Sequence, residues 1–128
     1  MVAIDTIAYA LAAVAAFIHV YIFYLESMAW HQPRAHRPFG VKSLYDVEAL
    51  APIMFNQGFY NLFLALGAMG GVLLGLNGSS VGESITLYTM AFMLGAALML
   101  IASNPKMRRG ALIQGLVPSL SFVLLLIA

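Results

Sequence analysis

Four uncharged stretches, each long enough to cross a lipid bilayer, constrain this chain more than any other feature of its sequence. They cover residues 6–25, 49–82, 84–102 and 110–128. The hydrocarbon core of a bilayer is about 30 Å thick, so an α-helix that rises about 1.5 Å per residue crosses it in about 20 apolar residues. We therefore expect an all-α integral membrane four-helix bundle, a single domain over residues 1–128, with spans at about residues 6–30, 53–76, 84–102 and 110–128.

The composition agrees with a lipid environment. Of the 128 residues, 62% are apolar and 9% are charged, and the mean hydropathy is +0.93. Average globular domains carry about 25% charged residues, so this chain has too few charges to cover a water-exposed surface. A soluble enzyme, a nucleic-acid-binding domain and a disordered chain are excluded. The absence of cysteine excludes disulfides and thiolate metal ligands.

Prolines complicate the limits of two spans. Pro52 leaves open a short lead-in helix over residues 46–52, because proline is tolerated in a first turn and kinks a helix interior. Pro118 predicts a kink or a tilt in the fourth span.

The distribution of basic residues predicts the orientation. All six lie in two segments, between spans one and two and between spans three and four: Arg34, Arg37, Lys42, Lys106, Arg108 and Arg109. Cytoplasmic loops are enriched in Lys and Arg, so the first and third loops are expected in the cytoplasm and both termini outside, in the periplasm. The same six residues could contact an anionic headgroup or a cytosolic anion.

Polar side chains inside the spans are the candidates for function, because they are costly in lipid and usually face the bundle interior or water. They lie towards the predicted cytoplasmic side: His19, Glu26, Asn56, Gln57, Tyr60, Asn61 and Gln114. His19 and Glu26 are seven residues apart and therefore share one helix face, where they could line a cavity. We expect these seven residues to form a polar site that binds a small polar or amphipathic ligand.

Each candidate also has a purely structural interpretation. Glu26 could be a boundary carboxylate paired with Arg34 or Arg37. His19 could be an interior histidine that bonds to a neighbouring helix, and the amides of the second span could join packed helices. No metal site is expected, because His31 and His36 lie in a loop without a carboxylate or cysteine nearby.

Glycines on the second span indicate close helix packing. Gly67, Gly71 and Gly75 are spaced four apart, a pattern that lets another helix approach closely. The partner helix could belong to the same chain or to a second copy, and we expect a homo-oligomer, a dimer or a trimer, in the bilayer.

Two segments resemble a known family. FIHVYIFYLESMAW and NQGFYNLFLALG, with Phe39-Gly40 between them, resemble a bacterial family of small four-span membrane proteins, domain of unknown function 1304. The resemblance covers nearly the whole chain. It implies an inner-membrane location and a multi-pass four-helix layout, and it leaves the activity open.

A second likeness is topological. Membrane-associated proteins in eicosanoid and glutathione metabolism are similar four-helix chains with outward termini, and they form trimers that bind glutathione. Those proteins carry Arg and Glu on the second helix, whereas this chain has amides and Tyr60 there. The likeness implies glutathione as a cofactor, with Tyr60 as hydrogen-bond donor and the basic loops holding carboxylates.

Three functions therefore remain open. The first is ligand binding at the polar site. The second is a glutathione-dependent membrane enzyme. The third is a proton-coupled exporter in which Glu26 titrates, since small multidrug transporters also place a glutamate in the first of four spans.

Overall fold

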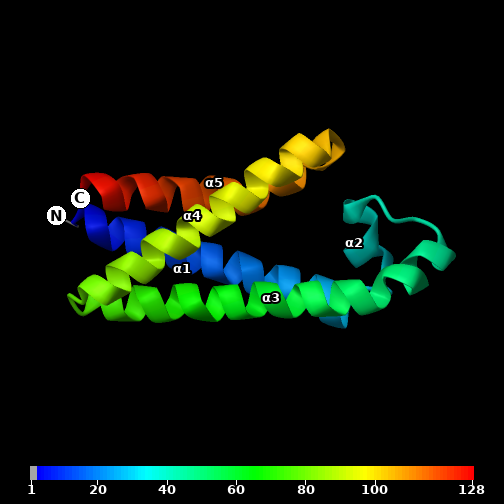
Figure 1. Ribbon diagram of the computed structural model, residues 1–128, viewed down its shortest axis with the longest axis horizontal. Helices are drawn as coiled ribbons and strands as arrows, with labels where there is room; N and C mark the ends of the chain where they lie inside the picture. Colours follow the sequence, from blue (N-terminus) through cyan, green and yellow to red (C-terminus); the bar gives the residue numbers. More distant parts are fainter. Residues whose placement is uncertain (1–2) are drawn as a thin grey trace.

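The computed structural model describes residues 3–128 as a bundle of antiparallel helices (Figure 1). Helix α1 (Ile4–Phe23) continues into a π-helical turn (Tyr24–Met28), and the short α2 (Pro33–His36), α3 (Leu44–Leu76), α4 (Ser80–Ser103) and α5 (Arg108–Ile127) follow. Within the described residues there is no strand. The four segments long and apolar enough to cross a membrane are Ile4–Met28, Leu44–Leu76, Ser80–Ser103 and Pro105–Ile127. The predicted all-α membrane fold is confirmed.

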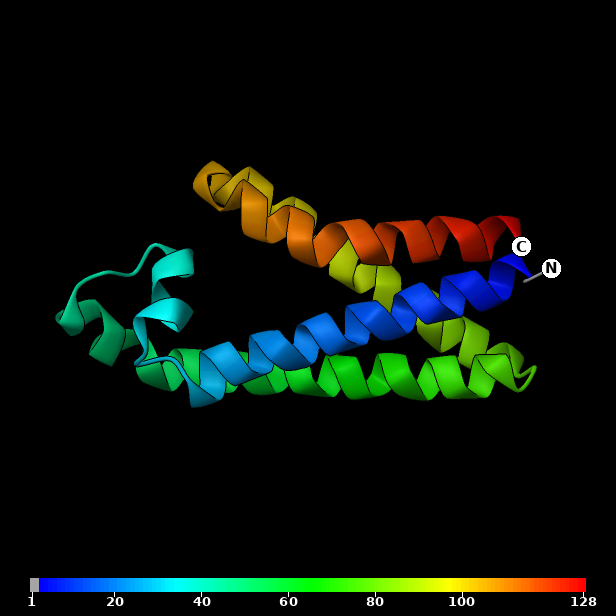
Figure 2. The ribbon, with the colours of Figure 1, turned by 180° about the vertical axis from the view of Figure 1, so that it is seen from behind.

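The four long helices form a ring in the order α1, α3, α4, α5. Helices α1 and α4 each pack against both α3 and α5, and the views from front and back agree (Figures 1 and 2). The start of α1, the end of α5 and the α3–α4 turn lie together at one end, which we call the acidic end because it carries Asp5 and Glu83. The opposite end carries residues 31–43 and 104–109, with all six Lys and Arg side chains, and we call it the basic end.

Small side chains bring α1 close to its neighbours near the acidic end. Ala8, Ala12 and Ala15 are completely buried in the core. The Ser121 hydroxyl of α5 donates a hydrogen bond to the Ala8 carbonyl at 2.7 Å, so α5 is fixed against α1 at this point. Met90 of α4 is also completely buried and fills the space between the helices.

Serine caps set the starts of α3 and α4. The Ser43 hydroxyl accepts a hydrogen bond from the Asp46 N–H at 3.1 Å, and the Ser79 hydroxyl accepts one from the Gly82 N–H at 3.3 Å. Such caps satisfy backbone donors that the first helical turn leaves free. Helix α4 therefore begins at Ser80, before the predicted start at residue 84.

Both prolines lie inside continuous helices. The segment predicted as a separate lead-in over residues 46–52 is the first part of α3, which passes through Pro52 without a break. Pro118 lies inside α5 and is buried.

The helices separate towards the basic end. Near the acidic end α5 lies against α1, whereas the first turns of α5 and the last turns of α4 diverge from the α1–α3 pair (Figures 1 and 2). The loop with α2 closes that end on the side of α1 and α3. This divergence creates the cavity described below.

Candidate functional site

The two sequence segments that carry the family resemblance contact one another. The π-helical turn lies against α3 where Gly58 faces it, and the Ser27 hydroxyl donates to the Phe55 carbonyl at 2.7 Å. A Cβ atom at Gly58 would lie 2.9 Å from Ser27 Cβ and 3.0 Å from the Phe23 carbonyl oxygen, so only glycine permits this approach. Phe23 and Phe59 pack edge to face beside it, with ring centroids 5.1 Å apart.

Glu26 and Asn61 meet at this junction. The Asn61 side-chain amide donates to Glu26 Oε1 at 2.6 Å and to the Gln57 carbonyl at 3.2 Å. Glu26 is 6% exposed, so its carboxylate lies inside the bundle. The turn around it is π-helical, closed by the bond from the Ala29 N–H to the Tyr24 carbonyl at 2.9 Å. This turn ends the first span, because the residues that follow Met28 are not helical.

Glu26 bonds to Asn61 and does not pair with the arginines of the first loop. Arg34 donates to the Tyr24 hydroxyl and to Gln32 Oε1, and its guanidinium lies over the Tyr24 ring. Within residues 3–128 the one contact of this kind between a basic and an acidic side chain joins His31 Nε2 and Glu48 Oε1, which are both exposed, at 3.2 Å.

His19 is buried on the same face of α1 as Glu26. Its Nδ1–H donates to the Ala15 carbonyl at 2.9 Å, because a carbonyl oxygen can only accept. The bond lies within α1, and Nε2 is the ring nitrogen left for another partner. The described hydrogen bonds therefore do not join His19 to Glu26.

The amides of α3 separate into two groups. Asn61 faces the π-turn, whereas Asn56, Gln57 and Tyr60 have exposed side chains on the outside of the bundle. Tyr60 is 71% exposed. The structure thus brings Glu26 and Asn61 together and leaves the other three α3 candidates on an outer face.

A cavity of about 610 Å³ opens between α1 and α5 at the basic end. Its walls are mostly apolar and come from α1, the turn after α2, the end of α4 and the start of α5: Ile18, Tyr21, Ile22, Leu25, Pro38, Phe39, Leu100, Met107, Gly110 and Ile113. Its volume lies in the range of about 300–1,000 Å³ that is typical of small-molecule sites.

The polar groups of this cavity are basic or neutral. Lys106, Arg109 and Gln114 line it, and of the seven polar residues predicted to share a site, Gln114 is the one that does so. Arg108, between Lys106 and Arg109 in sequence, does not line the cavity. The three basic residues of the first loop do not line it either, and all three are exposed: Arg34, Arg37 and Lys42. An apolar chamber with two cations at its edge is complementary to an amphipathic anion.

Trp30 holds the loop wall of the cavity in place. It is buried, and its indole N–H donates to the Val47 carbonyl of α3 at 2.9 Å. Its ring packs edge to face against His36 and Phe39, with centroids 6.1 and 5.7 Å away. Gly40 then reverses the chain with a φ of 79°, a conformation that glycine adopts without strain. Phe39 is thereby fixed as a wall of the cavity.

Of the three spaced glycines, two pack within the chain. A Cβ atom at Gly71 would lie 2.8 Å from Thr86 Oγ1 of α4, and one at Gly75 would lie 2.5 Å from the Tyr9 hydroxyl of α1. A Cβ atom at Gly67 would meet nothing within 4 Å, so this glycine lies on an open surface. Among the residues the structure describes, no three His, Asp or Glu side chains are placed to hold a metal ion.

Sequence reasoning missed the apolar walls of the cavity. Ile113 has nothing in its local sequence that separates it from lipid-facing residues, and Phe39, noted only for the family resemblance, lies in a loop that is not expected to line a site. The usable signal was the alternation of basic loops, which correctly marked the end of the bundle at which the cationic side chains gather.

Comparison with known proteins adds one assignment. No match to this chain is found among curated proteins or among solved structures. The family profile described as Protein of unknown function (DUF1304) matches residues 13–126, which include both contacting segments and the whole cavity. Because this match spans most of the sequence, the chain belongs to that family.

Proposed function

We propose that this protein is a membrane-embedded binding protein for an amphipathic anion, with the ligand's tail in the α1–α5 cavity and its head at Lys106 and Arg109. The cavity carries the proposal, because it combines a largely apolar interior with cationic side chains at one edge. The ligand class is a single acyl or alkyl chain that bears a carboxylate or phosphate.

Recognition in this proposal depends on the head of the ligand. A tail that moves from the bilayer into the cavity exchanges one apolar environment for another, so it gains little from the hydrophobic effect. Basic side chains near a membrane surface contribute about 1 kcal/mol each towards an anionic headgroup. Lys106 and Arg109 therefore supply the selectivity, and Gln114 adds a neutral hydrogen-bonding group.

The proposed setting is a cell inner membrane with the basic end in the cytoplasm. The support is that all six Lys and Arg residues lie at one end of the bundle, as the positive-inside rule requires. The ligand would then enter from the cytoplasmic leaflet.

Dodecyl phosphate, titrated into the protein in neutral nanodiscs, tests the proposal. Replacement of both cations, Lys106→Gln with Arg109→Gln, is expected to weaken binding about 25-fold, at about fivefold per charge. Arg108→Gln is the matched control, since this side chain carries the same charge but does not line the cavity. A weakening of about fivefold by Arg108→Gln, the same per charge as in the double variant, would show that only surface charge matters and would refute the proposal. Binding of the neutral dodecanol as tight as that of dodecyl phosphate would refute it as well.

Glutathione belongs in the same experiment as a competitor. The glutathione-enzyme hypothesis uses Tyr60 as hydrogen-bond donor, yet Tyr60 lies on the outer face of α3 and does not line the cavity. We expect glutathione not to displace dodecyl phosphate. Displacement at millimolar concentration would favour the enzyme hypothesis instead.

Proton-coupled export is a second candidate, supported by one observation. Glu26 is a buried acid in a membrane-spanning segment with a side-chain amide as its partner, and ionisable residues in such positions often belong to proton or substrate pathways. In proteoliposomes, an exporter would couple substrate efflux to proton entry, and Glu26→Gln would abolish the coupling. An exposed acid at the basic end, Asp46→Asn, serves as the control.

A further inference from the structure

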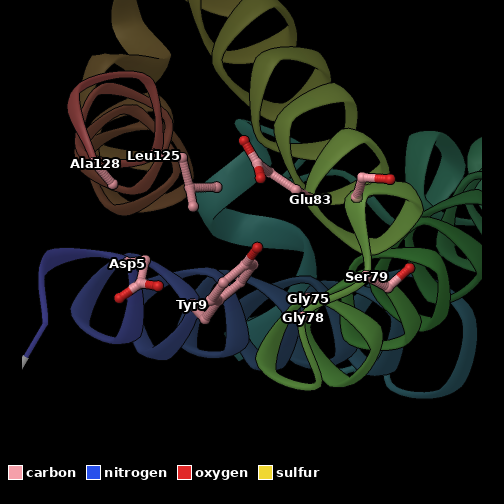
Figure 3. A pocket seen from close by; sticks show the side chains of 9 residues that line it. Asp5, Tyr9, Gly75, Gly78, Ser79, Glu83, Leu125 and Ala128 are labelled. Atoms are coloured by element: carbon pink, nitrogen blue, oxygen red, sulfur yellow. The ribbon is translucent and has the colours of Figure 1, made fainter.

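A second pocket lies at the acidic end, at the opposite end of the bundle from the α1–α5 cavity. Its volume is about 260 Å³, and it is formed by the first turns of α1 and α4, the α3–α4 turn and the end of α5 (Figure 3). Two carboxylates and several hydroxyl groups line it, from Asp5, Glu83, Tyr9, Ser79 and Ser80.

Asp5 and Glu83 have an ordinary structural role as well. They lie in the first turns of α1 and α4, where carboxylates stabilise helix starts. That role explains why acidic residues occur there, but it does not explain the hydroxyl group that projects into the pocket beside them.

Tyr9 supplies the independent observation. Its side chain is 5% exposed, and its hydroxyl points into the pocket towards Glu83 (Figure 3). None of the side-chain hydrogen bonds made within residues 3–128 uses this hydroxyl, whose oxygen stays open to the pocket. A phenol that is buried in this way normally has a hydrogen-bond partner, so a ligand or water is expected to supply it.

Gly75 makes room for this arrangement. A Cβ atom at Gly75 would lie 2.5 Å from both Tyr9 Cε1 and the Tyr9 hydroxyl oxygen. A side chain at position 75 would displace the Tyr9 ring into the pocket, and the ring would then occupy the space of the ligand. The phenol thus depends on this glycine for its position.

The pocket is negatively charged. All six Lys and Arg side chains lie at the other end of the bundle. Helices α1 and α4 begin at this end whereas α3 and α5 end here, so their macrodipoles largely cancel over the pocket. The Thr6 N–H donates to Asp5 Oδ1 at 2.7 Å, and none of the described Lys and Arg residues lies near the two carboxylates. The ligand that complements this pocket is a cation.

From these features we propose that the acidic-end pocket binds a small organic ammonium ion. The ammonium N–H groups would donate to Asp5, Glu83 and the Tyr9 oxygen, while the tyrosine O–H donates to a carboxylate. The apolar part of the ligand would rest against Leu125 and the tyrosine ring. A metal ion fits less well, because the described residues place no three acidic or histidine ligands together.

Saturation-transfer NMR with propylammonium chloride on the detergent-solubilised full chain tests this site. The wild type is expected to bind propylammonium saturably and to ignore 1-propanol, its neutral counterpart. Glu83→Gln and Tyr9→Phe are expected to weaken binding about tenfold and a few-fold, and Gly75→Ala to abolish it. Glu48→Gln, an exposed acid at the basic end, is the control and should change nothing.

Helical circular dichroism and elution volume establish that each variant is folded. The result for Glu83→Gln carries the most weight, because its side chain is exposed and the substitution leaves the packing of the helices unchanged. The proposal is overturned if propanol binds as well as propylammonium, if Glu83→Gln binds like the wild type, or if calcium binds and propylammonium does not. None of these outcomes depends on the cavity at the basic end.

Discussion

Gly58 shows most clearly how one residue determines the junction between α1 and α3. The π-turn approaches α3 so closely that its Ser27 side chain occupies the space a Cβ atom at position 58 would need. The approach places Asn61, one turn later, opposite Glu26. The absence of a side chain at Gly58 therefore permits the hydrogen bond that holds the buried acid.

Gly58→Ala is expected to destabilise the protein by about 1–3 kcal/mol, the usual cost of forcing atoms into a packed site. Unfolding in mixed micelles with increasing dodecyl sulfate measures the change. Gly67→Ala is the matched control on the same helix, because its new Cβ meets nothing within 4 Å and should be neutral or slightly stabilising. Equal effects of the two substitutions would contradict the packing account.

The Glu26–Asn61 bond has its own prediction. Asn61→Leu leaves a buried carboxylate without its amide donor, and a hydrogen bond to a charged group contributes about 1.5–3 kcal/mol. We expect a double-mutant cycle of Asn61→Leu with Glu26→Leu to give a coupling energy of this size. Asn56→Leu, on the exposed face of α3, should show none when cycled with Glu26→Leu. A coupling energy near zero for Glu26 and Asn61 would mean that the bond does not stabilise the fold.

At the scale of elements, the length of α3 explains why part of its polar surface is exposed. Its 33 residues extend about 50 Å, whereas the hydrocarbon core needs about 20 residues. If the outer limit of the core lies at Leu76, the other limit falls near Gln57. Asn56 and Gln57 then lie among the headgroups and Tyr60 one turn deeper, where exposed tyrosine is common.

The loop element depends on Trp30. Trp30→Phe removes the donor to the Val47 carbonyl and weakens the support of Phe39. Hydrogen exchange of residues 31–43 is expected to become about fivefold faster, the change that a loss of about 1 kcal/mol produces. Exchange in the middle of α3 should stay the same. Tyr45→Phe, at an exposed aromatic position nearby, is the control. Unchanged hydrogen exchange of residues 31–43 in Trp30→Phe would contradict the role of Trp30 as the support of this loop.

Elements were more predictable from the sequence than the contacts between them. The four apolar segments follow from composition, because the thickness of a bilayer sets their length locally. Which side of α3 faces α1 depends on the contact between Gly58 and Ser27, so the inward position of Asn61 and the outward position of Tyr60 could not be derived from spacing alone. Likewise, Arg109 lines the cavity and Arg108 does not, because successive residues of a helix point about 100° apart and the side of α5 that faces α1 is set by packing.

At the scale of the whole molecule, the main feature is that every Lys and Arg residue lies at one end. Acidic residues lie at both ends, Asp46 and Glu48 at the basic end and Asp5 and Glu83 at the acidic end, where no Lys or Arg accompanies them. By the positive-inside rule, we expect this asymmetry to set the orientation of the chain in a bilayer, with the two pockets near opposite faces of the membrane. The two proposals together predict that one chain binds an anionic amphiphile and a small cation from different sides of the membrane.

The orientation of the chain in the membrane can be measured by labelling cysteines introduced one at a time, because the chain has no cysteine of its own. Single substitutions at exposed sites, Tyr45→Cys at the basic end and Val81→Cys at the acidic end, provide the labels. In intact spheroplasts a membrane-impermeant maleimide is expected to label Val81→Cys alone, and after lysis both. Labelling of Tyr45→Cys in intact cells would reverse the predicted topology.

Native mass spectrometry of the protein extracted from its membrane in mild detergent tests the central claim most directly. The account predicts a dimer or trimer in which the wild type retains an acidic amphiphile. It also predicts that Gly110→Leu, which fills the α1–α5 cavity where a Cβ atom meets only Met107 Cε at 3.8 Å, retains none. A wild type without bound amphiphile, or a Gly110→Leu variant that retains the same one to the same extent, would contradict it.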